Sequence, residues 1–298
     1  MGESIRIACY GDNMDFPIPF AKMSGTGNDF IIIDNRDKIV ADDEMVNLAV
    51  QACRRGQSVG ADGLLLVESD EEFDFAWRFF NSDGSEAEMC GNAARCVARL
   101  AYLDGIAGTE SVFRTLSGPI RASVDGSTVR VQLTRPHSLQ PEFTLDVDND
   151  TALSAGFVDT GVPHTVIVLD DNSIETAAVE ELGREIRFHS RFAPNGTNVN
   201  FVQIMDSGNI LVRTYERGVE AETLACGTGV VASAIVTRAK GLTSSHVRAR
   251  TKDGDVLIIH LDETDPMAGN VYLEGNASIV YRGELTAETI FRSLTENS

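Results

Sequence analysis

The chain has few basic residues for its length and no long apolar run. Its 298 residues include 25 lysine and arginine residues against 45 aspartate and glutamate residues, a formal net charge of −20 at pH 7. Nucleic acids and anionic membranes are bound through clustered lysine and arginine, so this balance disfavours both partners. No apolar stretch approaches the roughly 20 residues that span a bilayer, and the first 20 residues lack the pattern of a secretory signal. We therefore expect a soluble, acidic protein of the cytoplasm.

Cysteine is also scarce, and its spacing disfavours the usual cysteine-rich sites. The five cysteines are Cys9, Cys53, Cys90, Cys96 and Cys226. They are too few and too scattered for a disulfide scaffold or for a four-ligand zinc site built from CxxC pairs. The chain also lacks a P-loop and a Rossmann glycine pattern, and no lysine stands out as an anchor for pyridoxal phosphate. We expect a protein with free thiols in a reducing cytoplasm, while the residues alone leave a pyridoxal phosphate lysine open.

Two of the cysteines have similar surroundings, one in each half of the chain. "EAEMCGNAARC" (86–96) and "LACGTGVVASA" (224–234) both place a cysteine and a glycine at the expected start of a helix rich in small residues. An ungapped alignment of Cys90 on Cys226 also matches Glu86 with Glu222 and Phe79 with Tyr215. This agreement predicts an ancient duplication, with the two cysteines in pseudo-symmetric positions.

The order of expected strands and helices repeats in the same way. Strands are predicted at 20–23, 30–34, 63–68, 73–81, 111–116, 120–124 and 128–134, and again at 156–159, 164–168, 197–205, 210–215, 247–251, 255–261 and 269–274. Helices are predicted at 42–56, 91–103, 177–188 and 227–240. Between the halves, "RPHSLQPEFTLDVDND" (135–150) has no clear period, and we expect the crossing between two domains there.

A cysteine at a helix start has distinctive chemistry. Backbone N–H groups without helical partners and the positive end of the helix dipole favour the thiolate, and the same groups can hold a carboxylate. Two such helix ends could place a sulfur on each side of an amino acid α-carbon, which suits proton removal from one face and delivery to the other. A thiolate is a weak base for this task. The surrounding N–H donors would therefore have to supply much of the barrier reduction.

Several other interpretations remain open from the residues alone. A buried lone cysteine is usually an inert apolar residue, which is our expectation for Cys9, Cys53 and Cys96. A redox pair or metal site competes at Cys90 and Cys226, although neither motif has a second thiol or a histidine beside it. Other candidate residues have ordinary explanations: His164 as a strand-end histidine, the neighbours Glu216 and Arg217 as a surface ion pair, and Asn28 as a turn residue.

Taken together, the motifs resemble those of the diaminopimelate epimerases. The resemblance covers about residues 20–285 and is carried by "KMSGTGNDF", "GADG", "FNSDGSEAEMCGNAARC", "GVPH", "TNVNF" and "YERGVEAETLACGTG". It implies an α/β (α+β) fold of two pseudo-symmetric domains, each a mixed β-sheet wrapped around a central helix, with the active site in the cleft. The implied domains are residues 1–135 with 278–298, and residues 136–277. The implied reaction is interconversion of LL- and meso-diaminopimelate without pyridoxal phosphate, any other cofactor or a metal, in lysine and peptidoglycan precursor synthesis.

Site residues carry over by position. The resemblance implies that Cys90 and Cys226 are the two catalytic bases, and that His164 and Glu216 tune the two thiols. The implied substrate-binding residues are Asn28, Asn81, Gly91, Asn92, Asn198, Glu216, Arg217, Gly227 and Thr228. The expected partner is the small-molecule substrate, and the resemblance is compatible with a homodimer.

Two departures bear on substrate selectivity. Many family members have Asn where this chain has Val162, and some have Gln where it has Gly63. Val162 cannot donate a side-chain hydrogen bond, so recognition of the distal end of the substrate could be rearranged. The alternatives are another cofactor-independent racemase or isomerase of the same fold, similar to proline racemase or to the phenazine-biosynthesis enzymes, and a non-catalytic thiol redox or binding protein.

Overall fold

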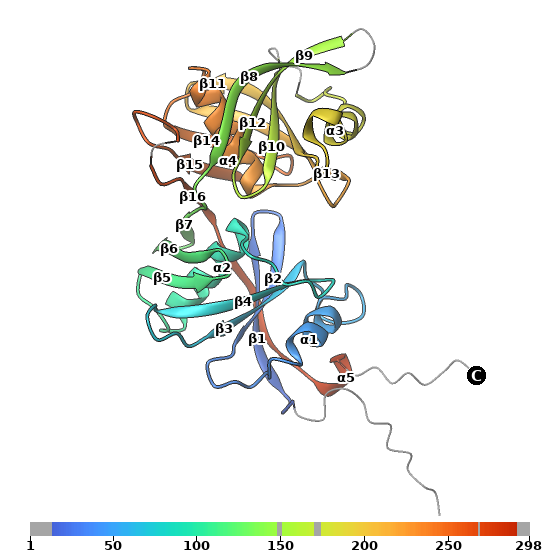
Figure 1. Cartoon of the computed structure of the whole chain (residues 1–298). Helices are drawn as coiled ribbons and strands as arrows, with labels where there is room; N and C mark the ends of the chain where they lie inside the picture. The colour runs from blue at the N-terminus through green and yellow to red at the C-terminus, as the bar shows by residue number, and fades with distance from the viewer. Residues whose placement is uncertain (1–13, 148–150, 170–173, 268, 291–298) are drawn as a thin grey trace, which may run out of the picture. The chain divides into compact units, whose positions relative to one another are not determined.

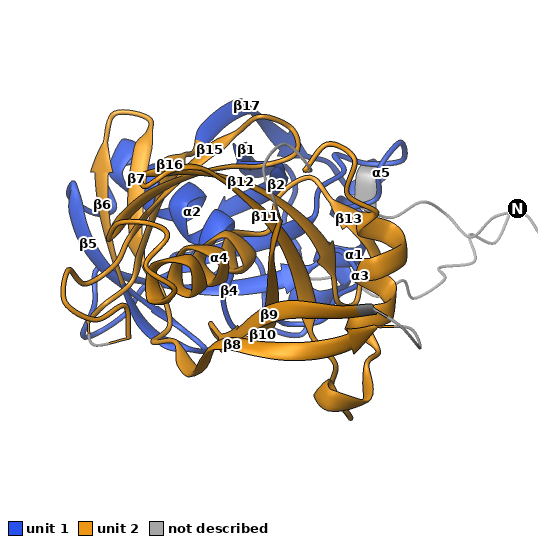
Figure 2. Ribbon diagram, turned by 90° about the horizontal axis from the view of Figure 1, so that it is seen from above, with its two compact units in different colours: residues 1–120, 278–298 blue, residues 121–277 orange. Residues whose placement is uncertain are grey.

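The computed structural model describes residues 14–147, 151–169, 174–267 and 269–290. The chain divides into two compact units, which Figure 2 colours separately: unit 1 is residues 1–120 with 278–298, and unit 2 is residues 121–277. The first boundary differs from the predicted crossing after residue 135. Residues 121–135 belong with the second half because β7 (Thr128–Gln132) pairs along its whole length with β16 (Tyr272–Asn276).

Unit 1 is a mixed sheet with one helix on each face. In order of pairing its strands are β17 (Ser278–Leu285), β1 (Ile18–Gly25), β2 (Asn28–Asp34), β3 (Gly63–Glu68), β4 (Phe75–Asn81) and β5 (Glu110–Thr115). The pairs β2–β3 and β4–β5 are parallel, and the others are antiparallel. The short helix α5 (Ala287–Ile290) follows β17.

The apolar runs in the middle strands explain the layers of unit 1. Ile31 and Ile33 share a core cluster with α1 (Met45–Ala52). Because successive side chains of a strand point to opposite faces, Phe30 and Ile32 face the other way. Helix α2 (Gly91–Leu103), which is buried over most of its length, contacts β1, β2 and β3. A sheet covered on both faces needs the continuous apolar runs that these strands have.

Unit 2 is a larger sheet that curves around one helix. In order of pairing its strands are β6 (Gly118–Asp125), which begins at the unit boundary, then β7, β16, β15 (Val256–His260), β14 (His246–Arg250), β12 (Asn209–Glu216), β11 (Asn198–Asp206), β10 (Pro163–Leu169), β9 (Thr151–Asp159) and β8 (His137–Val147). The three-residue strand β13 (Ala221–Thr223) also pairs with β12.

The central helix of unit 2 is α4 (Gly227–Ala239), which contacts seven strands of the sheet. Residues 229–237 of α4 are all buried, which requires protein on every side of the helix. Helix α3 (Val179–Arg187) covers the other sheet face and contributes Val179 and Ile186 to a second core cluster. Figure 1 labels both α3 and α4, and a short 3₁₀ helix, η1 (Ser190–Phe192), follows α3 in the chain. None of the described helices is long and apolar enough to cross a bilayer.

The strand order supports the predicted duplication. In unit 1, β2 pairs in parallel with β3, β3 pairs antiparallel with β4, and the Cys90 helix then leads to β5, parallel to β4. In unit 2, β10, β11, β12, the Cys226 helix and β14 repeat these steps with the same directions. The predicted mixed α+β fold class is confirmed, and each predicted helix and strand overlaps an observed one.

One stretch was interpreted wrongly. The stretch 135–150, in which no strand was predicted and the crossing between domains was expected, contains the 11-residue strand β8. Its register with β9 breaks twice, between His137 and Gln140 and between Gln140 and Phe143. Each break shifts the alternation of side chains between faces, so the period of two that identifies a strand is lost. Strands β13 and β17 were also not predicted.

Candidate active site

Both motif cysteines occupy the N-cap position of their helices. Cys90 precedes α2 and Cys226 precedes α4, each with extended backbone angles (φ −146°, ψ 122° and φ −124°, ψ 108°). The carbonyl of each cysteine accepts the first helical hydrogen bond, from Ala94 at 2.9 Å and from Val230 at 3.0 Å. The three N–H groups that follow each cysteine therefore have no partner within the helix, and N–H groups in this position can bind an anion.

The remaining cysteines differ from these two. Cys53 and Cys96 are buried, and burial raises the pKa of each thiol to about 12. Such thiols stay protonated at neutral pH, in line with the prediction that they are inert apolar residues. Cys9 lies outside the described residues. Cys90 is half-buried and Cys226 is 8% exposed.

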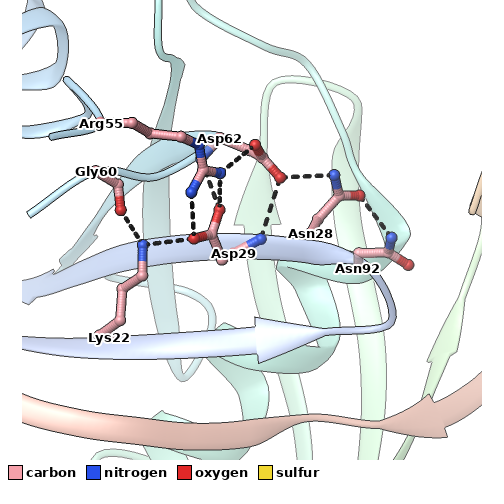
Figure 3. Close-up of polar contacts among 7 residues, drawn as sticks. All are labelled: Lys22, Asn28, Asp29, Arg55, Gly60, Asp62 and Asn92. Atoms are coloured by element: carbon pink, nitrogen blue, oxygen red, sulfur yellow. Dashed lines mark hydrogen bonds and ion pairs between the residues drawn. The ribbon is translucent and has the colours of Figure 1, made fainter. Parts of the chain in front are cut away.

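In unit 1, the predicted residues Asn28 and Asn92 contact each other. Asn92 Nδ2 donates to Asn28 Oδ1 at 2.7 Å and to the carbonyl of Thr26 at 3.2 Å. Asn28 Nδ2 in turn donates to Asp62 Oδ2 at 2.9 Å (Figure 3). Because a carbonyl and a carboxylate only accept, these contacts fix which end of each amide carries the nitrogen.

A network of charges supports this amide pair. The Arg55 guanidinium binds Asp29 and Asp62, and Lys22 binds Asp29 at 2.8 Å and the carbonyl of Gly60 (Figure 3). Burial alone would favour the neutral form of Asp29, but Arg55 and Lys22 hold the pKa of its carboxyl below the usual value. The ionised form of Asp29 is therefore favoured, and Arg55 links this residue to Asp62, which positions Asn28.

A fully buried arginine lies in the first turns of α2. Arg95 donates to Thr26 Oγ1 at 2.9 Å, to Asn92 Oδ1 at 3.0 Å and to the carbonyl of Gly91 at 3.4 Å. Arg95 is 0% exposed. Arg95 thus fills the remaining acceptor side of the Asn92 amide and places a permanent positive charge within five residues of Cys90.

Asn81 and Gly63 lie opposite each other in the β3–β4 ladder. The amide of Asn81 donates to Ser85 Oγ at 3.0 Å in the following turn. The structure thus places Asn81 at the end of β4 but in a separate set of contacts from Asn28 and Asn92. A Cβ at Gly63 would lie 2.6 Å from the ring of Phe79 and 2.8 Å from the carbonyl of Phe80, so in this chain a larger residue there requires a shift.

In unit 2, a histidine takes the place of the asparagine pair. His164 Nε2 lies 3.0 Å from Thr228 Oγ1, and Thr228 Oγ1 lies 3.5 Å from Cys226 Sγ. Burial lowers the pKa of His164 to about 3, and the nearby positive charge of Arg217 contributes to the same shift. The imidazole is therefore neutral at physiological pH, and three predicted residues form one chain of contacts that ends at the sulfur.

The other predicted residues of unit 2 form a second group. Asn198 donates from Nδ2 to the carbonyl of Pro163 at 3.1 Å and accepts from the backbone N–H of Arg217 at 2.8 Å. Burial raises the pKa of Glu216. The side chain of Arg217 lines a pocket of about 310 Å³ together with Asn195, Pro163, Asp159, Gly196, Ala193, Arg191, Gln140, Phe157 and Phe192.

Several supporting residues were missed from the sequence. Asp62 and Asn200 belong to the motifs "GADG" and "TNVNF", but their roles depend on partners far along the chain. Lys22 and Arg95 also lie within motifs, "KMSGTGNDF" and "FNSDGSEAEMCGNAARC", whereas Arg55 lies in none of them. Motif membership would have identified all of these residues except Arg55 as candidates, but the partners they contact depend on which strands and loops lie side by side.

Comparisons with known proteins agree with the motifs. The family model described as diaminopimelate epimerase matches residues 20–138 and 156–280. A diaminopimelate epimerase of Aquifex aeolicus is 46% identical over 285 residues, covering 91% of this chain and 99% of that protein. The diaminopimelate epimerase of Archaeoglobus fulgidus is 39% identical over 280 residues, covering 90% of this chain and 96% of that one.

Solved structures with the same fold are more distant in sequence. A PhzF-family phenazine biosynthesis protein of Bacillus anthracis has a TM-score of 0.68 and 14% identity, covering 91% of this chain and 100% of its own. A probable proline racemase of Agrobacterium radiobacter, solved with bound carbonate, has a TM-score of 0.66 and 16% identity, covering 93% and 97%. At this identity the likeness establishes the fold alone.

Proposed function

Because the chain belongs to the diaminopimelate epimerase family, we propose that it interconverts LL- and meso-diaminopimelate with Cys90 and Cys226 as its two bases. The observation that supports this most is the repeated N-cap cysteine. Two units with the same strand order each present one thiol at the start of a buried helix. The reaction needs no cofactor and serves lysine and peptidoglycan precursor synthesis in the cytoplasm.

The helix ends supply the electrostatic part of catalysis. An amino acid α-proton is far less acidic than a thiol, so a thiolate base alone cannot remove it at a useful rate. General base catalysis contributes roughly 10²- to 10⁴-fold, and each placed hydrogen-bond donor roughly 10²- to 10³-fold. The N–H groups at Gly91, Asn92, Gly227 and Thr228 hold the substrate carboxylate, where they also stabilise the charge that develops when the proton leaves.

The two sulfurs exchange roles with the direction of reaction. One thiolate takes the α-proton from one face, and the other cysteine, as a thiol, delivers its own proton to the opposite face. Atoms and charge balance at each step. The substrate C–H bond breaks as an S–H bond forms at the thiolate, and the S–H bond of the thiol breaks as a new C–H bond forms on the opposite face. The reverse reaction starts with the opposite protonation pattern.

The distal amino acid group of the substrate is held by the remaining predicted residues. The guanidinium of Arg217 can bind a carboxylate through two parallel hydrogen bonds, and Asn198 and Glu216 can accept from an ammonium. Asn81 adds a further amide. Val162 offers no side-chain hydrogen bond. Arg217 and its neighbours therefore carry a larger share of the recognition of the distal group than they would if residue 162 were an asparagine.

The test is isotope exchange during turnover in D₂O, with proline and lysine stereoisomers as control substrates. A thiol carries one exchangeable proton, so the donating sulfur holds solvent deuterium, while the abstracting sulfur holds the proton just taken from the substrate. We expect deuterium in the meso product well before it appears in recovered LL substrate, and the same asymmetry in the reverse direction. Equal labelling of both pools at early times would contradict the two-thiol mechanism. Faster turnover of a control substrate would contradict the assigned substrate.

A further inference from the structure

A buried asparagine behind the Cys226 half-site holds His164 in one orientation. Asn200, in β11, is 0% exposed, and its Nδ2 donates to the carbonyl of Thr165 at 3.1 Å. Its Oδ1 accepts from Thr214 Oγ1 at 3.0 Å. Because the Thr165 carbonyl can only accept, the nitrogen end of the amide must point toward it.

This orientation determines the proton on the histidine ring. Asn200 Nδ2 also lies 3.1 Å from His164 Nδ1, so it donates its second hydrogen there and Nδ1 is the unprotonated nitrogen. A neutral imidazole with a bare Nδ1 carries its proton on Nε2. His164 Nε2 therefore donates to Thr228 Oγ1, and the single hydroxyl proton of Thr228 is left for the sulfur of Cys226.

We propose that Asn200 is a positioning residue, which fixes the Nε2–H form of His164 and so directs the Thr228 hydroxyl proton to the Cys226 sulfur. A donor aimed at a thiolate stabilises it, because hydrogen bonds to charged groups are the stronger ones. The effect of Asn200 on turnover depends on the proposed function, whereas its effect on the ring proton and on the thiolate does not.

The helix leaves space for this amide at one position. A Cβ at Gly229, the third residue of α4, would lie 2.3 Å from Asn200 Oδ1 and 3.2 Å from Thr214 Oγ1. Strand register gives the position matching Asn200 in unit 1. Asn200 pairs with Val166, two residues beyond the pair His164–Asn198. The equivalent first pair in unit 1 is Phe30–Gly63, and two residues beyond it Leu65 pairs with Ile32, so an apolar leucine stands where unit 2 has Asn200. The device therefore belongs to the Cys226 half alone.

The experiment compares Asn200→Asp with Gln203→Glu in the full chain. Both variants change a buried amide of β11 into a carboxylate, but Gln203 accepts from the N–H of Ile174 on another side of the strand. A carboxylate at residue 200 accepts from Nδ1 and so reverses the ring proton. Thr214→Val is a milder second variant of similar size, which frees the amide of Asn200 to rotate.

Two measurements need no substrate. Nitrogen NMR of protein labelled in histidine reports which ring nitrogen of His164 carries the proton, and mass spectrometry reports the rate at which iodoacetamide alkylates Cys226 at pH 7. We expect Nε2–H in the wild type and in Gln203→Glu. In Asn200→Asp we expect Nδ1–H with alkylation about tenfold slower, and in Thr214→Val a smaller change of the same kind.

The outcomes separate the inference from the proposed function. Nδ1–H in the wild type, or an unchanged ring proton in both Asn200→Asp and Thr214→Val, overturns the inference, as does a changed ring proton with unchanged alkylation. If the ring proton and alkylation change as expected but the wild type does not turn over diaminopimelate, the inference stands and the proposed function fails. With turnover present, we expect kcat to fall about tenfold in Asn200→Asp and KM to change less than twofold.

Discussion

The half-sites around Cys90 and Cys226 share a backbone frame but differ in the polar groups that support it. Around Cys90, Asp62, which is paired with Arg55, holds Asn28, and buried Arg95 holds Asn92. Around Cys226, the supporting groups are neutral: an imidazole, an amide and two threonine hydroxyls. The duplication therefore kept the N-cap cysteine, which depends on backbone geometry, while the side chains behind it diverged.

One contact recurs in both halves with the same sequence separation. The second residue of each central helix reaches a strand residue 64 positions earlier, Asn92 to Asn28 and Thr228 to His164. His164 and Phe30 begin the equivalent parallel strand pairs β10–β11 and β2–β3. Val162 lies two residues before His164, and Asn28 lies two residues before Phe30. Unit 2 thus lacks an amide at the register position of Asn28, and a histidine makes the contact instead.

The largest expected effect tests what the halves share. Cys90→Ser and Cys226→Ser should each reduce kcat by at least about 10²- to 10⁴-fold, because an alcohol is a far weaker base than a thiolate. Urea unfolding should show both variants folded, and Cys53→Ser, at the buried C-cap of α1 rather than at the start of either motif helix, serves as a control. Retention of more than a few per cent of activity in either variant would count against equal roles for the two halves.

The next effect tests the charged support of unit 1. Asp29→Asn removes the carboxylate beside Lys22, which is 5% exposed, and should lower the free energy of unfolding by about 2 kcal/mol because a largely buried ammonium loses its counter-ion. Asp34→Asn, at the other end of β2, breaks an exposed pair with Arg36 and should cost less than about 1 kcal/mol. If urea unfolding gave the same loss of unfolding free energy for both variants, the Lys22–Asp29 pair would contribute no more than an exposed surface ion pair.

A smaller effect tests the third residue of each central helix. Gly229→Ala gives α4 the residue that α2 has at Ala93, but its Cβ would meet Asn200. Overpacking should exceed the gain in helix propensity and destabilise the fold by about 1–2 kcal/mol, with reduced kcat. The reverse change, Ala93→Gly, should cost about 1–2 kcal/mol through lower helix propensity and the loss of one buried methyl group. A more stable Gly229→Ala enzyme with full activity would contradict the packing argument.

The smallest effect concerns pH. Because His164 is neutral in the fold with a pKa of about 3, its ring proton signal should not shift between pH 8 and pH 5 in an NMR titration that uses free imidazole as reference. The unfolded chain takes up this proton below about pH 6.5, so the stability that His164 contributes is lost as pH falls from about 6.5 toward 3. A midpoint near pH 6 for His164 would place a charge in the half-site that we describe as neutral.

Much of the fold and part of the site follow from short stretches of sequence. The Cys-Gly helix starts at Cys90 and Cys226, the apolar strands and their repeated order are set by contacts within a few residues, and local patterns predict them. Strand β8 escaped prediction because its register breaks remove the alternation. The first unit boundary escaped as well, since it depends on the pairing of β7 with a strand more than a hundred residues later.

The sequence by itself determined the family, the mixed α+β class, the two N-cap cysteines and the types of side chain near them. Only the tertiary structure decided which of those side chains meet. The contacts of Asn28 with Asn92, of Asp29 with Arg55 and of Asn200 with His164 join residues 26 to 64 positions apart. Strand register and burial create these contacts, and burial also makes His164 neutral. No local pattern encodes them, because each depends on where a distant segment packs.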